Sequence, residues 1–325
     1  MTAQDDHNSD GRGRTCIVIG HAALDHVYRI AEFPVQPIKI RALEHFDSGG
    51  GMAANAAAAI GRLGWPVELW SRIGGDDAGR NVCRMLSEAG VDTTFVRVLP
   101  SARTATAAVI VDGKGERLVV SERDHAMPLD ADWIPLDRIE NCGAVLSDLN
   151  WKEATLAAFS KARAHDVATI VDIDTGSGGI FEEIIRLTDF AIFSSVALDR
   201  FVPGATITAK LASVVARGCR HAGVTLGSQG YVWTDRSGNL RQQAAFKVDV
   251  VDTTGAGDAF HGAFAWAIAR GCEDEAAALI ASAVAAMKCR RLGARLGLPS
   301  RGELEAFLAE LAASRPGGAK AGGGT

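Results

Sequence analysis

The feature that most constrains the fold of this 325-residue chain is a repeated alternation of two kinds of segment. Short runs rich in β-branched residues are followed by Ala- and Leu-rich stretches whose apolar residues recur at helical spacing. The runs are residues 16–19, 67–70, 144–146, 168–171, 191–193 and 224–226. Strands separated by helices pair in parallel and are covered on both faces. The sequence therefore predicts an α/β fold, a three-layer α/β/α sandwich with a mostly parallel central sheet.

One part of the chain departs from this alternation. Residues 104–111 and 117–121 are β-rich and are separated by a short glycine-bearing loop, which predicts a β-hairpin. A further extended stretch, residues 27–42, precedes the first helix. We expect segments 27–42 and 104–121 to form a small antiparallel β-sheet that projects as a lid. Because so few strands cannot bury both faces alone, the lid also predicts a homodimer.

Composition limits the class of protein. The polar residues 1–14 and the Gly- and Ala-rich residues 315–325 are expected to be disordered tails, which leaves one domain over residues 15–314. No apolar stretch approaches the roughly 18–20 residues of a membrane span, and the N-terminus lacks a signal-peptide core, so we expect a cytoplasmic protein. A net charge of -5 offers no basic surface for nucleic acid, so the expected partners are small molecules.

The strongest chemical signal lies in residues 248–258, where a predicted strand ends in Gly255, Ala256 and Gly257 and a helix begins. Small residues let backbone N–H groups approach an anion at a helix N-terminus, where the dipole adds about half a positive charge. The turn therefore predicts a phosphate cradle. The carboxylate of Asp258 beside it could take a proton from an attacking hydroxyl, or it could only cap the helix.

A second motif is the triple glycine that opens the helix after residue 48. Gly50 and Gly51 allow a polar ligand to reach the backbone, and Asn55, one turn later, offers both a donor and an acceptor. Taken alone, the glycines could instead form a tight turn beside a closely packed helix. The chain has neither the GxxxxGK[ST] loop nor a GxGxxG turn after its first strand, which disfavours P-loop and Rossmann folds.

Together and in this order, the two motifs resemble the ribokinase-like, or PfkB, family of carbohydrate kinases. The similarity extends over residues 16–311, with further matches at 20–25, 73–79, 90–92 and 225–230. Residues 246–263 and 286–289 are most similar to bacterial sulfofructose kinases, and less so to ketohexokinases. The arginine that such a kinase directs at a sulfonate is replaced by Asn150, and a neutral amide is a poor sulfonate partner. The resemblance thus implies a ketose-like acceptor without the sulfonate.

The resemblance also implies a reaction and a set of site residues. ATP would donate its γ-phosphate to a primary hydroxyl of a sugar, a ketose or ketose derivative, with Mg²⁺ as cofactor and K⁺ beside the anion hole. Asp258 would be the base, and the anion hole would comprise Gly255, Ala256 and Gly257. The acceptor would contact Asp25, Gly50, Gly51, Asn55, Arg117 and Asn150. The nucleotide would lie against Thr225, Gly227 and Gly230. The monovalent-cation region would include Asp252 and Thr254 together with the loop of residues 288–297.

Several points stay open at this level. The family's Asn-x-x-Glu stretch, which helps to organise magnesium, is here Ser-Ser-Val-Ala at residues 194–197 and has no acid. Asp172 and Asp174 could steady Mg²⁺ instead, or they could cap the next turn. Arg117 could be an ordinary exposed strand residue. The alternatives to a sugar kinase are a nucleoside kinase of the same fold and a non-catalytic sugar- or nucleotide-binding regulator, although the intact Asp258 argues against the latter.

Overall fold

The structure is a computed structural model, and it describes residues 14–175, 182–235 and 237–313. The tails expected at residues 1–14 and 315–325 lie outside the described residues, except for Arg14.

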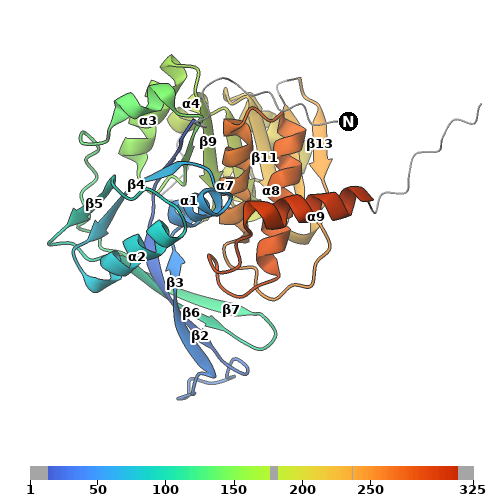
Figure 1. Ribbon diagram of the computed structural model, residues 1–325. Coiled ribbons are helices and arrows are strands. Elements are labelled where there is room, and N and C mark those ends of the chain that lie inside the picture. The colour runs from blue at the N-terminus through green and yellow to red at the C-terminus, as the bar shows by residue number, and fades with distance from the viewer. Residues whose placement is uncertain (1–13, 176–181, 236, 314–325) are drawn as a thin grey trace, which may run out of the picture.

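The main body is built on a nine-stranded sheet in the order β13-β12-β11-β10-β9-β8-β1-β4-β5 (Figure 1). Neighbouring strands from β5 to β11 run parallel, whereas β12 and β13 pair antiparallel at one edge. The strands are β1 (Cys16–Ile19), β4 (Val67–Gly74), β5 (Val96–Leu99), β8 (Ala144–Ser147), β9 (Ala168–Ile173), β10 (Phe190–Ser194), β11 (His221–Thr225), β12 (Tyr231–Asp235) and β13 (Leu240–Gln243).

Helices cover both faces of this sheet, because each central strand is apolar on both sides. In β1, Cys16 and Val18 enter one buried cluster, whereas Ile17 and Ile19 enter the other. The first cluster is shared with α1 (Met52–Arg62), α2 (Asp77–Glu88), α7 (Ala256–Ala269), α8 (Asp274–Cys289) and α9 (Arg301–Ala313). The second is shared with η1 (Leu136–Asn141), α3 (Lys152–Ala164), α4 (Glu182–Leu187), α5 (Ser195–Phe201) and α6 (Ile207–Val215). The predicted α/β/α sandwich is confirmed.

Helices α1 and α7 pack against each other unusually closely. A Cβ atom on Gly262 of α7 would lie 2.3 Å from the carbonyl oxygen of Ala56 in α1. The facing positions of α1 are a run of buried alanines, so the two backbones can approach. This contact brings together the two motifs singled out in the sequence.

The lid is a separate four-stranded sheet in the order β3-β2-β6-β7, which projects from the body (Figure 1). It comprises β2 (Ala23–Arg29), β3 (Glu44–Gly50), β6 (Ala105–Val111) and β7 (Arg117–Glu122), so the predicted hairpin is present. The expected segment 27–42 is corrected, because residues 30–43 form a loop without strand and the second strand lies beyond them. The outer pairs are antiparallel, but β2 and β6 run parallel. Both follow parallel strands of the main sheet, β1 and β5, and so leave the body in the same direction.

One face of the lid is already buried within the protein. Val27, Ala107, Val109 and Val111 form a small cluster against which Phe46 packs. The opposite face and the edge strand β7 are open, and the exposed apolar residues there include Tyr28, Leu118 and Val120. Among the residues that the structure describes, no helix has the length and apolar character needed to cross a membrane.

The segment before the glycine turn differs from the prediction. Residues 244–250 form no strand, although their apolar pattern suggested one. Instead, the N–H groups of Val251 and Asp252 both donate to the carbonyl oxygen of Cys289, at 2.8 and 3.2 Å. The segment is therefore tethered to the end of α8 rather than to the sheet.

Candidate active site

The glycine turn begins α7 as predicted. Gly255 is the N-cap residue with φ 73°, a left-handed conformation that favours glycine. A Cβ atom at this position would also lie 2.8 Å from the side chain of Ala294, whereas one on Gly257 would face open space. The N–H groups of a first helical turn have no acceptor within the helix, so this turn can bind an anion.

Asp258 lies in that first turn and is partly buried. Burial, followed by the charge of the nearby Asp172, raises the pKa of Asp258 to about 7. Its Oδ2 atom accepts a hydrogen bond of 2.7 Å from Nδ2 of Asn55, a contact between α7 and α1. A carboxylate with a pKa near neutrality, held beside an anion-binding turn, has the properties of a general base.

Asn55 is held in turn by a residue that the sequence analysis missed. The Nε atom of Arg295 donates to Oδ1 of Asn55, and Nη2 donates to the carbonyl oxygen of Gly50, both at 2.8 Å. The first bond fixes the orientation of the Asn55 amide, so that its nitrogen faces Asp258. Arg295 is 8% exposed, and its Nη1 atom is buried without a partner in the described structure. Burial lowers the pKa of Arg295 to about 10, although Asp25 and Asp258 oppose this.

Asp25 and Gly50 lie beside this arginine, and Gly51 follows Gly50 in the chain. A Cβ atom on Gly50 would lie 2.1 Å from Oδ1 of Asp25, and one on Gly51 would lie 2.5 Å from the carbonyl oxygen of His21. Only glycine allows these approaches, so the triple glycine is required here by packing and by proximity to the carboxylate. Burial raises the pKa of Asp25 to about 6, against the opposing charge of Arg295.

The lid faces the body across a small cavity. This cavity has a volume of about 10 Å³ and lies between Asp25, Val109 and Val111 on one side and Asp252 and Thr254 on the other. It holds about one water molecule.

A much larger cleft lies on the other side of the glycine turn. It has a volume of about 480 Å³, and Thr225, Gly227 and Gly230 line it together with Ala256 and Gly257. The three residues expected to border the nucleotide thus share one cleft with the glycine turn. The remaining wall includes Phe246, Lys247, Val248, Val250 and Phe260.

Arg117 of the lid reaches the loop before the glycine turn rather than the acceptor residues. Its Nη1 atom donates to Oγ1 of Thr253 at 2.9 Å, and Thr253 lines the large cleft. The side chain of Arg117 therefore lies at the edge of the large cleft, next to the loop that precedes the glycine turn.

Asp252 and Thr254 lie beside a buried lysine. The carboxylate of Asp252 accepts from the N–H groups of Thr254 and Gly293, both at 2.8 Å. Burial favours a higher pKa of Asp252, but the charge of Lys288 and these two donors outweigh it and lower the pKa. Lys288 is fully buried, and its Nζ atom donates to the carbonyl oxygen of Asp252 at 2.7 Å. The buried Oγ1 atom of Thr254 has no hydrogen-bond partner among the described residues, and a role of Asp252 and Thr254 in binding K⁺ stays a prediction.

Asp172 and Asp174 are not gathered into a cation site of three or more ligating side chains within residues 14–175, 182–235 and 237–313. Asp172 is buried, and its Oδ2 atom lies 3.3 Å from Nδ1 of His261. Burial, together with the charges of Asp148 and Asp174, raises the pKa of Asp172 well above its ordinary value. A role of this pair in binding Mg²⁺ stays a prediction.

Asn150 is joined to a second arginine that sequence reasoning missed. Nη1 of Arg123, which follows lid strand β7, donates to Oδ1 of Asn150 at 2.6 Å. The backbone N–H of Asn150 donates to the buried Asp148, which also accepts from the N–H of Ala53 at the start of α1. The guanidinium group of Arg123 therefore lies beside Asn150, where the sequence predicted only a neutral amide.

The α/β/α fold, the lid, the anion-binding turn and the carboxylate beside it together define a kinase of small molecules. Residues 14–301 match the pfkB family carbohydrate kinase, and the chain belongs to this family. The fold is ribokinase-like: a crystal structure from Agrobacterium tumefaciens has a TM-score of 0.87 and 35% identity, covering 92% of this chain and 99% of that one.

Curated relatives with different acceptors show similar identity. A ribokinase of Bacillus subtilis is 28% identical over 298 residues, covering 91% of this chain and 99% of its own length. A nucleoside kinase of Methanothermobacter thermautotrophicus is 27% identical, covering 89% and 94%. The structure of Arabidopsis thaliana ribokinase complexed with ribose and ATP has a TM-score of 0.81 and 26% identity, covering 91% and 99%. Similarity therefore establishes a kinase and leaves the acceptor open.

Proposed function

We propose that the protein is an ATP-dependent sugar kinase that transfers the γ-phosphate to a primary hydroxyl of a ketose or ketose derivative. The observation that carries this proposal is the placement of Asp258. Its carboxylate lies between the acceptor residues and the large cleft, beside an anion-binding helix terminus. A similar structure supports ATP as the donor, since the ribokinase of Arabidopsis thaliana is complexed with ribose and ATP.

In the proposed mechanism, the acceptor hydroxyl lies within hydrogen-bonding reach of Asp258, which takes its proton as the oxygen attacks the phosphorus. Asn55 holds the carboxylate in place, and Arg295 orients Asn55. The N–H groups at the start of α7 stabilise the charge that develops on the phosphoryl group. Arg117 lies at Thr253 when the lid is closed, so closure adds a positive charge to the same group.

Two cations belong to this proposal. Kinases of this family generally use ATP with Mg²⁺, which would shield the phosphate charges. The carboxylates that remain candidates for steadying it are Asp172 and Asp174. For K⁺, Asp252 and Thr254 would supply oxygen ligands, and the ion would stabilise the loop that precedes the glycine turn. Because Lys288 already contributes a positive charge there, we expect K⁺ to stimulate the reaction rather than to be essential.

The acceptor is the least determined part of the proposal. The contact between Arg123 and Asn150 favours including ketoses that carry an anionic group, because it brings a guanidinium group to the acceptor side. The relatives that act on nucleosides keep a nucleoside acceptor as the alternative.

A screen of ADP release tests the proposal directly. It would compare ketoses, aldoses, sugar acids, sugar phosphates, sulfonated sugars and nucleosides under the same conditions, with Asp258→Asn as the control. We expect the highest kcat/KM for a ketose or its anionic derivative, and a fall in kcat of at least about 10²-fold in the variant. A higher kcat/KM for a nucleoside would favour the alternative, and binding of ATP without turnover of any acceptor would favour a regulator.

We also propose that the lid mediates a homodimer. Its buried face is occupied within the protomer, so the partner would cover the opposite face, which exposes Leu118 and Val120. A cytoplasmic location stays a prediction.

A further inference from the structure

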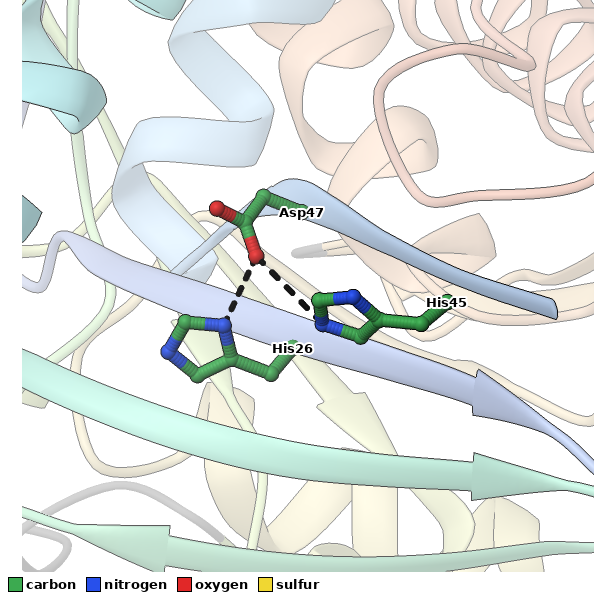
Figure 2. Close-up of side chains that lie close together, drawn as sticks. All are labelled: His26, His45 and Asp47. Carbon is green, nitrogen blue, oxygen red and sulfur yellow. Dashed lines mark hydrogen bonds and ion pairs between the residues drawn. The ribbon is translucent and has the colours of Figure 1, made fainter. Parts of the chain in front are cut away.

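The outer face of the lid carries a cluster of three side chains with metal-ligating atoms. They are His26 of β2 and His45 and Asp47 of β3, and Figure 2 shows them pointing toward one another. Nδ1 of His26 lies 2.7 Å from Oδ1 of Asp47, and Nε2 of His45 lies 3.8 Å from the same oxygen. All three ligand atoms lie within 4.8 Å of one another.

Strand pairing holds these side chains together. His26 lies directly opposite Asp47 in the register of β2 and β3, and His45 lies two residues before Asp47 on the same strand. Side chains two residues apart on a strand point to the same face. The cluster therefore follows from the backbone of the sheet and does not depend on a chance meeting of long side chains.

Neighbouring residues orient two of the three ligands. Nδ2 of Asn81 in α2 donates to Oδ2 of Asp47 at 3.4 Å, which leaves Oδ1 directed at the histidines. The ring of Tyr28 stacks on that of His45, with centroids 4.5 Å apart. Supporting contacts of this kind are typical of metal ligands, whose rings and carboxylates are held by an outer layer of residues.

We propose that His26, His45 and Asp47 bind one divalent transition-metal ion of the zinc class. Zinc bonds to imidazole nitrogen and carboxylate oxygen are about 2.0–2.2 Å long, which places neighbouring tetrahedral ligands roughly 3.3 Å apart. The observed separations from Asp47 Oδ1, 2.7 and 3.8 Å, lie on either side of that distance, so small side-chain rotations suffice. Two imidazoles select zinc, copper or nickel over Mg²⁺ and K⁺, which prefer oxygen ligands.

The cluster is accessible to an ion from solvent. The side chains of His26, His45 and Asp47 are 38%, 47% and 34% exposed. Water can therefore occupy the fourth position of a tetrahedral site. On binding, the ion takes the place of the Nδ1 hydrogen that His26 shares with Asp47, and the neutral ring carries its one hydrogen on Nε2 instead.

The position of the cluster gives the ion a structural consequence. The site joins β2 to β3, and the same two strands carry Asp25 and Gly50 on the acceptor side. His26 directly follows Asp25 in the chain. A bound ion would therefore hold together the strands that present the acceptor residues. This consequence rests on the proposed function, whereas metal binding itself does not.

Calorimetric titration of zinc into the untagged, full-length protein, first treated with a chelator, tests the proposal. We expect one ion per chain, and binding at least about tenfold weaker in His26→Gln and in His45→Gln. The matched control is His165→Gln, a partly exposed histidine that follows α3, which should bind zinc like the wild type. Thermal unfolding without metal would show that each variant is folded. Because zinc binding is read directly, the result does not depend on which acceptor is phosphorylated.

Cobalt spectroscopy distinguishes this site from binding by cysteine. Co²⁺ in the proposed site should show tetrahedral absorption without a thiolate charge-transfer band, and the His26→Gln variant should lose it. Absence of zinc binding, or equal binding by His26→Gln and His165→Gln, would overturn the proposal. One ion for every two chains would also overturn it, because the three ligands of one lid would then not form the site.

Discussion

Replacing Asp258 with asparagine should stabilise the ligand-free protein while it abolishes most activity. In the folded protein the pKa of Asp258 is raised from 3.8 to about 7, so the charged form is disfavoured by folding. The difference of about 3, at about 1.4 kcal/mol per pKa unit, sets an upper limit of about 4 kcal/mol. Because the side chain is only partly buried, water screens this cost, and we expect about 2 kcal/mol. Asparagine keeps the shape and can still accept the hydrogen bond from Asn55.

The difference in stability between the variant and the wild type should change with pH in a defined direction. Between about pH 4 and pH 7 the unfolded chain has lost the proton of Asp258, whereas the folded chain still holds it. Wild-type stability should therefore fall across this window relative to the variant, and the difference should be constant above pH 7. We expect the Tm of Asp258→Asn to exceed that of the wild type by about 4 °C at pH 8, and by less at pH 5.

The assay is thermal unfolding of both proteins without ATP, Mg²⁺ or acceptor, at pH 5, 6, 7 and 8. Glu305→Gln, which changes an exposed acid on α9, serves as the control and should follow the wild type at every pH. Equal Tm values for wild type and Asp258→Asn at pH 8, or a difference that does not change with pH, would refute the reasoning. Loss of activity alone would not support it.

Three further predictions concern Arg295, the K⁺ site and the lid-mediated dimer. Arg295→Met should lower kcat by at least about tenfold. It should also move the acid limb of kcat/KM to higher pH, because the loss of a positive charge near Asp258 raises the pKa of that carboxyl. An unchanged pH profile would show that Arg295 does not act through the base. Potassium chloride should give higher rates than tetramethylammonium chloride at matched ionic strength, and equal rates would exclude a K⁺ site at Asp252 and Thr254. The double variant Leu118→Glu, Val120→Glu should dissociate the dimer in sedimentation experiments. Val119→Glu, whose side chain lies on the other face of β7, should not. A wild-type protein that stays monomeric at high micromolar concentration would rule out the lid-mediated dimer.

Much of the fold could be predicted from the sequence because it depends on local patterns. The buried strands are short apolar runs, and the lid hairpin shows a β-rich pattern with a glycine-bearing loop. The parallel pairing of β2 and β6 was not predicted, since it depends on where the strands leave the main sheet. The strand expected before the glycine turn was wrong for a similar reason, because Val251 and Asp252 donate to the end of α8 instead of pairing with a strand.

The candidate site could likewise be predicted only where its residues are neighbours in the chain. The glycines and Asp258 follow one another in a recognisable motif, so their proximity could be predicted. Lys288 begins the loop that the resemblance places beside Asp252, and it does contact Asp252. The partners of Arg295 and Arg123 are about 240 and 27 residues away in the chain, and no motif reveals them. The charge of an arginine alone does not say which group it will meet.

The close contact of α1 and α7 has a consequence for synthesis of the protein. The hydrogen bond from Asn55 to Asp258 joins residues separated by 203 positions, and Gly262 allows their helices to meet. During synthesis, α1 with Asn55 therefore leaves the ribosome long before α7 with Asp258. Contacts of such high sequence separation form late and slow folding. We infer that a nascent or truncated chain lacking α7 does not have the complete site.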